Sequence, residues 1–259
     1  MSIPTGHERY LSALTLRQIR EIPEKDGALV IVPTGAIEQH GPHLPVGVDS
    51  MLSQAWLGYA LSRLEADDPV WVAPPITYGK SNEHVGFPGT VTIERAALRK
   101  LLRVILSQLL DWGFRNIALL NTHGGNTPVL KTSIREFELE HPECRLGFLS
   151  FEGVDFGLSE QEATYGFHAG EWETSLLLEL APDCCDPEEA SCEYPARVDD
   201  PGKLRPESAP AIYAWVTADL SESGIMGDAT AGSAEKGRRF FESGAEGLVQ
   251  SMRKWLRGL

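Results

Sequence analysis

Residues 30–49 read VIVPTGAIEQHGPHLPVGVD, a strand-like run that continues into a polar loop. The apolar, β-branched run at 29–33 predicts a strand buried on both faces, which is typical of a parallel sheet covered by helices. Glu38, His40 and Asp49 follow that strand, and the glycines and prolines between them favour fixed turns. Ligands of open α/β sheets bind beyond the carboxyl ends of the strands, and carboxylates and imidazoles are common metal ligands. The stretch therefore predicts a metal site at the edge of an α/β sheet, although any one of these residues alone would more often belong to a solvated loop.

The rest of the chain alternates strand-like and helical patterns. Further strands are predicted near residues 70, 116 and 145, and amphipathic helices at 98–109 and 234–256. This order predicts the α/β class, as a three-layer αβα sandwich with a mostly parallel sheet and right-handed crossovers. We expect residues 1–259 to form a single domain, with a loop or lobe insertion around 183–210, where proline and acidic residues are frequent.

A second candidate site segment follows the strand predicted at 116–121. His123 comes directly after that strand, so it belongs to the same edge of the sheet as the first loop. Gly124 and Gly125 come next and allow the backbone to approach a ligand closely. The segment therefore adds one imidazole and an open backbone to the predicted site.

A third segment, HAGEWETS at 168–175, leads into a predicted helix. His168 precedes the helix, and Glu171 and Glu173 lie in its first turn, where acidic residues also complement the helix dipole. The two glutamates point about 200° apart on a helix, so they are not expected to face the same ion. From helical geometry alone, either of them could be the ligand.

Composition limits the classes of partner. Lys+Arg of 23 against Asp+Glu of 37 gives a formal net charge of −14, which disfavours nucleic acid and anionic membrane surfaces as partners. The chain contains no apolar run long enough for a membrane span, and its first residues lack the apolar stretch of a signal peptide. We therefore expect a cytoplasmic protein. The four cysteines lack the paired spacing of a structural zinc site and are expected to be reduced.

Four motifs together resemble those of a known family. They are EQHGPHLP at 38–45 with Asp49, YGKSNEH at 78–84 with FPGT at 87–90, NTHGGN at 121–126, and HAGEWETS at 168–175. In their order and approximate spacing they resemble the creatininase (creatinine amidohydrolase) family of metal-dependent amidohydrolases, over about residues 10 to 256. The resemblance implies a creatininase-like fold and hydrolysis of a C–N bond.

The resemblance also implies a ligand set. The chain would hold two divalent metal ions bridged by Asp49, with Glu38 and His123 on one ion and His40 and Glu173 on the other. Zn²⁺ is the first expectation, and Mn²⁺ or Fe²⁺ are the alternatives, because mixed imidazole and carboxylate ligands suit all three.

Other roles follow from the same resemblance. His168 would be the catalytic proton shuttle, since an imidazole titrates in the range where it can protonate a departing nitrogen. Apart from the resemblance, Ser81 and Gly124 are expected to contact the substrate, a small-molecule amide. Ser81, Glu83 and His84 form a polar loop that is either part of the pocket wall or a solvated turn, and Gly124 lets the backbone approach a ligand. The family further implies a homo-oligomer, specifically a hexamer.

One departure from the family pattern bears on the substrate. Creatininases proper carry a tyrosine and a glutamate where this chain has Gly124 and Gly125, and residues 163–167 lack the family's tryptophan. Creatinine itself is therefore not expected to be held in the same way. We favour a di-metal amidohydrolase that cleaves a non-peptide C–N bond, in a cyclic amide or a formamide, with a metal-activated water.

Two alternatives to this function remain open. One is a small-peptide hydrolase of the mycofactocin-maturation type, and the other is a non-catalytic metal-dependent binding protein. His168 argues against the second, because a site that only binds metal needs no titratable group beside its ligands.

Overall fold

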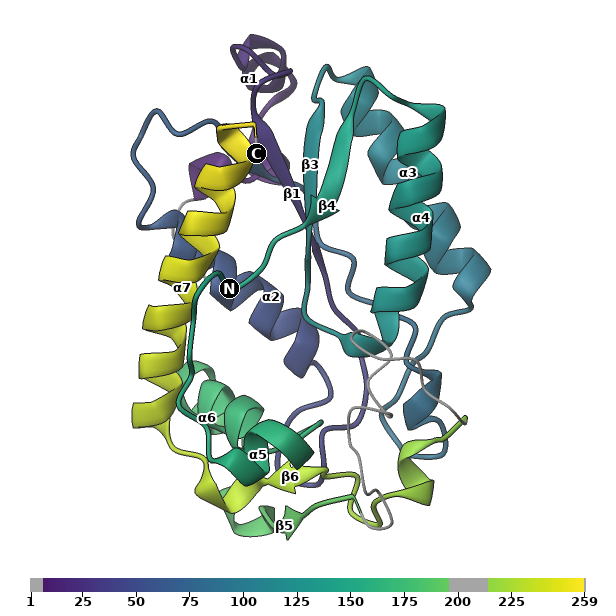
Figure 1. Ribbon diagram of the computed structural model, residues 1–259, viewed down its shortest axis with the longest axis vertical. Coiled ribbons are helices and arrows are strands. Elements are labelled where there is room, and N and C mark those ends of the chain that lie inside the picture. The colour runs from purple at the N-terminus through teal and green to yellow at the C-terminus, as the bar shows by residue number, and fades with distance from the viewer. Residues whose placement is uncertain (1–6, 196–213, 259) are drawn as a thin grey trace.

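The computed structural model describes residues 7–195 and 214–258, and its centre is a four-stranded parallel sheet. The strand order is β2-β1-β3-β4, and every neighbouring pair is parallel (Figure 1). The strands are β1 (Leu29–Thr34), β2 (Val70–Val72), β3 (Asn116–Asn121) and β4 (Arg145–Phe148). Each begins at its predicted position, so the predicted parallel sheet is confirmed.

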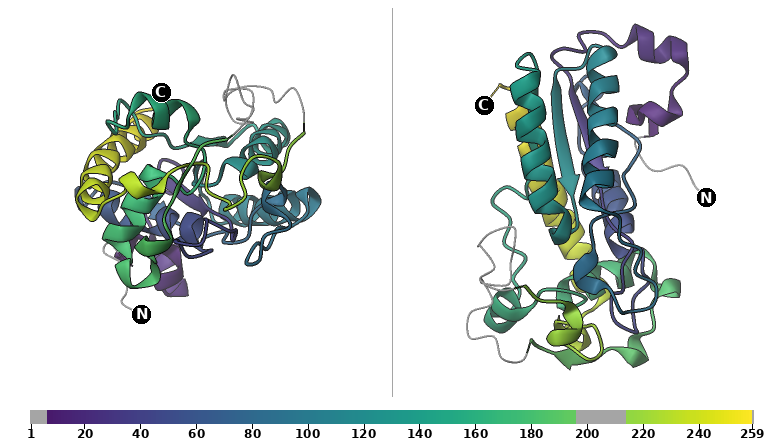
Figure 2. Two further views of the ribbon diagram at one scale, coloured as in Figure 1. Left: turned by 90° about the horizontal axis from the view of Figure 1, so that it is seen from below. Right: turned by 90° about the vertical axis from the view of Figure 1, so that its right-hand side faces the viewer.

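Helices cover both faces of this sheet (Figure 1). One layer contains α3 (Arg95–Asp111) and α4 (Thr127–Glu140), which lie side by side in the right-hand view of Figure 2. The other layer contains α2 (Val48–Leu61), α6 (Glu171–Leu180) and α7 (Ala234–Leu256), which contact one another. The short α-helices and strands are α1 (Leu16–Glu21), α5 (Glu160–Tyr165), β5 (Cys192–Glu193) and β6 (Gly227–Asp228), and several 3-10 turns lie between the elements. The predicted αβα sandwich is thus confirmed.

Alternate side chains of β1 enter two separate cores. Leu29 and Ile31 pack with the α2, α6 and α7 layer, and Val30 and Val32 pack with the α3 and α4 layer. All four are fully buried. Burial of each such side chain contributes about 1.5–3 kcal/mol, which explains why residues 29–32 are all apolar and do not alternate in polarity.

The carboxyl ends of β1 and β3 lie next to each other. Thr34 pairs with Asn121 at the end of the shared register, and the Thr122 amide donates to the Thr34 carbonyl at 3.0 Å. The loops that follow these strands therefore leave the sheet side by side. The elements α5, α6, β5 and β6 lie at this end of the molecule, opposite α1 (Figures 1 and 2).

Some predictions concern parts of the chain away from the sheet. Residues 196–210 of the insertion predicted at 183–210 lie outside the described residues, and the single-domain organisation stays a prediction. All four cysteines are free thiols, as expected. None of the helices in the described part of the chain has the length and apolar character needed to cross a bilayer.

Candidate metal centre

The five predicted metal ligands converge at the carboxyl end of the sheet. The loop after β1 carries Glu38 and His40, and the first turn of α2 carries Asp49. The loop after β3 carries His123, and the first turn of α6 carries Glu173. The first four residues are at most 4% exposed, and the Glu173 side chain is 14% exposed. Carboxylates are rarely buried without a partner, so this gathering needs an explanation.

Asp49 lies between two histidines. Its Oδ1 is 3.7 Å from His40 Nε2, and its Oδ2 is 3.4 Å from His123 Nδ1. Two ligands of one tetrahedral ion, each about 2.1 Å from it, lie roughly 3.4 Å apart. The two separations are close to that value, so each oxygen of this carboxylate lies at the spacing from a histidine nitrogen that two ligands of one ion would have.

A second carboxylate lies beside each of these two histidines. Glu173 Oε1 lies 3.7 Å from His40 Nε2, which gives the Glu173 cluster of His40, Asp49 and Glu173. Glu38 Oε2 lies 3.2 Å from His123 Nδ1, which gives the Glu38 cluster of Glu38, Asp49 and His123. Each cluster offers one imidazole nitrogen and two carboxylates, a donor set that suits Zn²⁺ or Mn²⁺.

Glu171 belongs to neither cluster. Its Oε1 accepts a hydrogen bond from Lys236 Nζ of α7 at 2.7 Å, and its carbonyl accepts from Ser175 Oγ at 2.6 Å. Among the described residues no lysine or arginine pairs with Glu173, whose Oε2 accepts from the Ala169 amide at 2.6 Å while Oε1 faces His40. Of the two glutamates, the structure therefore brings only Glu173 to the other candidate ligands.

Backbone carbonyls fix the tautomers of both cluster histidines. His40 Nδ1 lies 3.1 Å from the Glu38 carbonyl, and His123 Nε2 lies 3.0 Å from the Lys80 carbonyl. A carbonyl oxygen only accepts hydrogen bonds, so these nitrogens carry the ring protons. In the neutral rings the lone pairs are then on His40 Nε2 and His123 Nδ1, the atoms that face the carboxylates. Lone pairs and carboxylate oxygens repel each other unless a cation lies between them.

Three buried atoms of the clusters have no hydrogen-bond partner among the described residues. They are Glu38 Oε2, His40 Nε2 and Asp49 Oδ2. An unpaired buried polar atom costs about 1–3 kcal/mol, and such atoms are uncommon. A divalent ion in each cluster would satisfy all three, so the residues present fit a two-metal centre.

The electrostatics of the site also require positive charge. Burial lowers the pKa of His40, yet the carboxylates of Glu173 and Asp49 outweigh burial and hold it well above its usual value. Burial likewise lowers the pKa of His123, and Glu38 raises it well above its usual value. Burial and the charge of Glu38 raise the pKa of Asp49 to about 6. In the absence of a metal the clusters therefore retain protons, which a divalent ion would displace.

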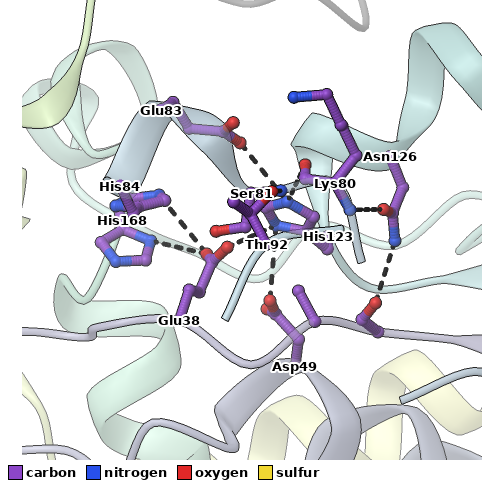
Figure 3. Close-up of polar contacts among 12 residues, drawn as sticks. Glu38, Asp49, Lys80, Ser81, Glu83, His84, Thr92, His123, Asn126 and His168 are labelled. Carbon is purple, nitrogen blue, oxygen red and sulfur yellow. Dashed lines mark hydrogen bonds and ion pairs between the residues drawn. The ribbon is translucent and has the colours of Figure 1, made fainter. Parts of the chain in front are cut away.

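His168 lies beside the clusters, with its ring between two other imidazoles. Its centroid is 4.2 Å from that of His40 and 4.1 Å from that of His84. Its Nε2 donates to the Gln39 carbonyl at 2.6 Å, so its lone pair is on Nδ1, 3.7 Å from Glu38 Oε1 (Figure 3). Burial lowers the pKa of His168 to about 4, which leaves the ring neutral near pH 7. The site thus contains an unprotonated nitrogen next to the candidate ligands.

The two predicted substrate contacts lie on the loops around His123. Ser81 is fully buried, and its Oγ has no hydrogen-bond partner among the residues that the structure describes. Its amide donates to Thr92 Oγ1 at 2.9 Å, which fixes the loop, and Figure 3 shows it beside His123. Gly124 is exposed and begins the 3-10 turn Gly124–Asn126.

Asn126 connects the site loops, a role that the sequence did not suggest. Its Oδ1 accepts from the Lys80 amide at 2.8 Å, and its Nδ2 donates to the Gly35 carbonyl at 3.0 Å (Figure 3). The residue is fully buried. Its place in the NTHGGN motif was the only sequence signal, because its partners are 46 and 91 positions away along the chain.

Comparisons with known proteins agree with this geometry. The sequence profile of a family described as creatininase, creatinine amidohydrolase, matches residues 12–252. A mycofactocin precursor peptide peptidase from Mycolicibacterium smegmatis is 34% identical, across 98% of this chain and 93% of that protein. A creatinine amidohydrolase from Pseudomonas putida is 28% identical, across 95% of this chain and 96% of that protein.

Solved structures give the same result for the fold. A structure described as creatininase Mn has a TM-score of 0.76 and 26% identity, and the match covers 95% of this chain and 98% of that chain. A mutant creatininase described as Zn-Zn type also has a TM-score of 0.76 and 26% identity, over 95% and 97% of the two chains. The expected creatininase-like fold is therefore confirmed.

Proposed function

Because the chain belongs to the creatininase family of metal-dependent hydrolases that act on C–N bonds, we propose that it hydrolyses an amide bond in a small peptide. The main support is the likeness to the peptide peptidase, which at 34% exceeds the 28% identity to the creatinine amidohydrolase. The sequence patterns favoured a non-peptide bond, and the relatives favour the peptide alternative. Gly124 supports a peptide as well, since an exposed residue without a side chain leaves room for an extended substrate.

We propose that the Glu38 cluster and the Glu173 cluster each hold one divalent ion, with Asp49 shared between them. The unpaired buried atoms Glu38 Oε2, His40 Nε2 and Asp49 Oδ2 support this assignment. When bound, two such ions supply the Lewis acidity that polarises an amide carbonyl and acidifies an attacking water. Zn²⁺ and Mn²⁺ are the favoured ions, since related structures are described with each.

His168 is proposed as the group that moves the proton. Its Nε2–H is anchored to the Gln39 carbonyl, which keeps the lone pair on Nδ1 and fixes the direction of the ring. In this role Nδ1 accepts a proton from the attacking water and then donates it to the departing amine nitrogen, so the ring ends the cycle neutral. A positioned group of this kind contributes about 10²- to 10⁴-fold in rate.

Ser81 and Gly124 are proposed to bind the substrate. The unpaired Ser81 Oγ offers a hydroxyl to a substrate amide, and its fixed loop means that little entropy is lost on binding. The exposed Gly124 offers its backbone to the same ligand. Ser81→Ala should therefore raise KM more than it lowers kcat, because it removes binding that is uniform between ground and transition states.

Metal analysis and a substrate screen test the proposal together. Purified protein should contain about two divalent ions per chain. Short peptides should be hydrolysed faster than creatinine, hydantoins or formamidopyrimidines. A metal-free protein with full activity would contradict the metal centre. Turnover of the cyclic amides with none of the peptides would support the second candidate, a non-peptide amidohydrolase, which the 28% identity to a creatinine amidohydrolase favours.

We also propose a homo-oligomer, hexameric by resemblance to the family. Size-exclusion chromatography with light scattering tests this directly, since one chain has a mass of 28.4 kDa. A single species at that mass would contradict the proposal.

A further inference from the structure

One short turn contacts both non-bridging residues of the Glu38 cluster. The turn η3 (Asn82–His84) lies in the loop between β2 and α3, and its consecutive residues Glu83 and His84 point to different ligands (Figure 3). Glu83 Oε1 is 3.3 Å from His123 Nε2, and His84 Nε2 is 3.4 Å from Glu38 Oε1. Each contact is made to the ligand's other polar atom and not to the atom assigned to the metal.

The ring N–H of His123 has two acceptors, the Glu83 carboxylate and a backbone carbonyl. The Nε2–H of that ring is directed to the Lys80 carbonyl at 3.0 Å and to Glu83 Oε1 at 3.3 Å. Both acceptors keep the proton on Nε2 and so present the lone pair of Nδ1 to the Glu38 cluster. Gly125 makes room for this contact, because a Cβ atom there would overlap Glu83 Oε1 and lie 2.5 Å from both His123 Nε2 and the Lys80 carbonyl.

A chain of hydrogen bonds orients His84 and allows only one position for the proton of its neutral ring. The Gln39 side-chain oxygen accepts from the Gly41 amide at 2.8 Å, and its nitrogen donates to the Gly224 carbonyl at 3.1 Å. That nitrogen also lies 2.9 Å from His84 Nδ1, which must therefore accept. The Thr217 hydroxyl lies 2.9 Å from the same ring nitrogen. The proton of the neutral ring is then on Nε2 and points to Glu38 Oε1.

The Glu173 cluster is supported differently. His40 Nδ1 donates to the Glu38 carbonyl, and Glu173 Oε2 accepts from the Ala169 amide. Both supports are backbone groups outside η3. The two clusters therefore share Asp49 but depend on different supporting residues.

We propose that η3 is the element that positions one metal of the pair, with Glu83 acting through His123 and His84 acting through Glu38. Neither residue is a ligand in this assignment; both are positioning residues of the Glu38 cluster. The inference rests on the proposed two-metal centre. Loss of such a supporting partner typically lowers metal affinity by about 10- to 100-fold.

Competition titrations of Zn²⁺ against a chromophoric chelator, on the full chain, test the Glu83 contact. Wild type should give two binding constants, and Glu83→Ala should weaken one by about 10- to 100-fold and leave the other unchanged. Glu83→Gln should recover part of the loss, because its amide oxygen still accepts from His123 Nε2. The matched control is Glu179→Ala, since the Glu179 side chain is also 18% exposed but pairs with Arg238 on the outer surface.

His84 is tested by a pair of variants with opposite expectations. His84→Gln retains an N–H donor near the position of Nε2, and His84→Leu removes it while keeping the site filled. The leucine variant should weaken the same single constant as Glu83→Ala, and the glutamine variant should be closer to wild type. Equal losses in both constants would indicate general loosening of the site and would overturn the proposal.

Variants that retain only one of the two clusters show which ion Glu83→Ala affects. In Glu173→Gln, which should keep only the ion of the Glu38 cluster, adding Glu83→Ala should weaken that remaining ion by the same factor. In His123→Asn, adding Glu83→Ala should leave the remaining ion unchanged. If wild type binds no Zn²⁺, the proposed metal centre itself fails. If wild type binds two ions and Glu83→Ala binds both as tightly, only the role of η3 fails.

Discussion

Lys236 and Glu171 form an ion pair between α7 and α6, with Nζ 2.7 Å from Oε1. The Glu171 side chain is 7% exposed, whereas the Lys236 side chain is 38% exposed, so water partly screens the pair from the Lys236 side. This pair holds the Glu171 side chain at the interface between α6 and α7. Its neighbour Glu173, two residues along the same turn, is the glutamate that faces His40.

The two glutamates should therefore respond to substitution in opposite ways. Glu171→Gln should retain both metal ions and lower the free energy of unfolding by about 1–3 kcal/mol, the range for a lost charged hydrogen bond. Glu173→Gln should lose one ion. Elemental analysis and denaturant titration of the two variants measure both effects. If Glu171→Gln loses an ion and Glu173→Gln keeps both, the roles are reversed.

Asp49 should be the one ligand whose loss affects both ions. Asp49→Asn keeps the shape of the side chain but removes the charge that each cluster uses, so both binding constants for Zn²⁺ should fall and activity should fall with them. Asp111→Asn, at the exposed end of α3, is the matched control and should change neither constant. Loss of only one ion from Asp49→Asn would show that this carboxylate does not bridge.

His168→Asn should separate proton transfer from metal binding. We expect both ions to remain, because His168 faces the clusters from beside them, and we expect kcat to fall by about 10²- to 10⁴-fold. Metal content and steady-state kinetics of the same preparation give both numbers. A variant that has lost an ion would make His168 a ligand, and one with unchanged kcat would remove it from the reaction.

Removal of the metal should reverse the pH dependence of stability between pH 6 and 8. Burial lowers the pKa values of His40 and His123, but nearby carboxylates raise both above the usual value in the metal-free protein. A pKa raised on folding stabilises the protein below the unfolded value and loses this effect as pH rises through the folded value. The melting temperature of chelator-treated protein should therefore fall from pH 6 to pH 8.

The metal-loaded protein should show the opposite trend over this range, because its ligands must lose their protons to bind an ion. Thermal unfolding with Zn²⁺ and with chelator, at several pH values, makes the comparison. The same slope in both series would contradict the assignment of these histidines to the metal.

Much of the candidate site could be predicted because its candidate ligands follow local patterns. Glu38, His40 and His123 lie just beyond buried strands. Such a strand is predicted by a short apolar run between turn residues, a pattern within a few neighbouring positions. The choice between Glu171 and Glu173 was different. The structure distinguishes the two glutamates through Lys236, which pairs with Glu171. Lys236 is 65 positions from Glu171 along the chain and reaches α6 only when α7 packs against it.

The supporting residues were beyond sequence reasoning for the same reason. Ser81, Glu83 and His84 form one polar loop segment, and nothing in their order distinguishes a substrate contact from a partner of a metal ligand. The difference comes from long-range contacts such as that of Lys80 with His123, which no local periodicity encodes. The position of each hydrogen-bond partner is a property of the folded chain.

The close packing of α6 on α7 also sets an order of events during synthesis. Leu176 and Leu177 of α6 are fully buried in a core that includes Phe240 and Phe241 of α7, and the Gly237 backbone leaves no space for a Cβ atom against Ser175. A chain still emerging from the ribosome has made Glu38 and His123 long before it has made the helix that holds α6 in place. The ligands of the Glu38 cluster are thus synthesised first, and the helix that packs against α6 and Glu173 is synthesised only when translation is almost finished. Nascent chains arrested before residue 234 should accordingly retain fewer ions than the released protein.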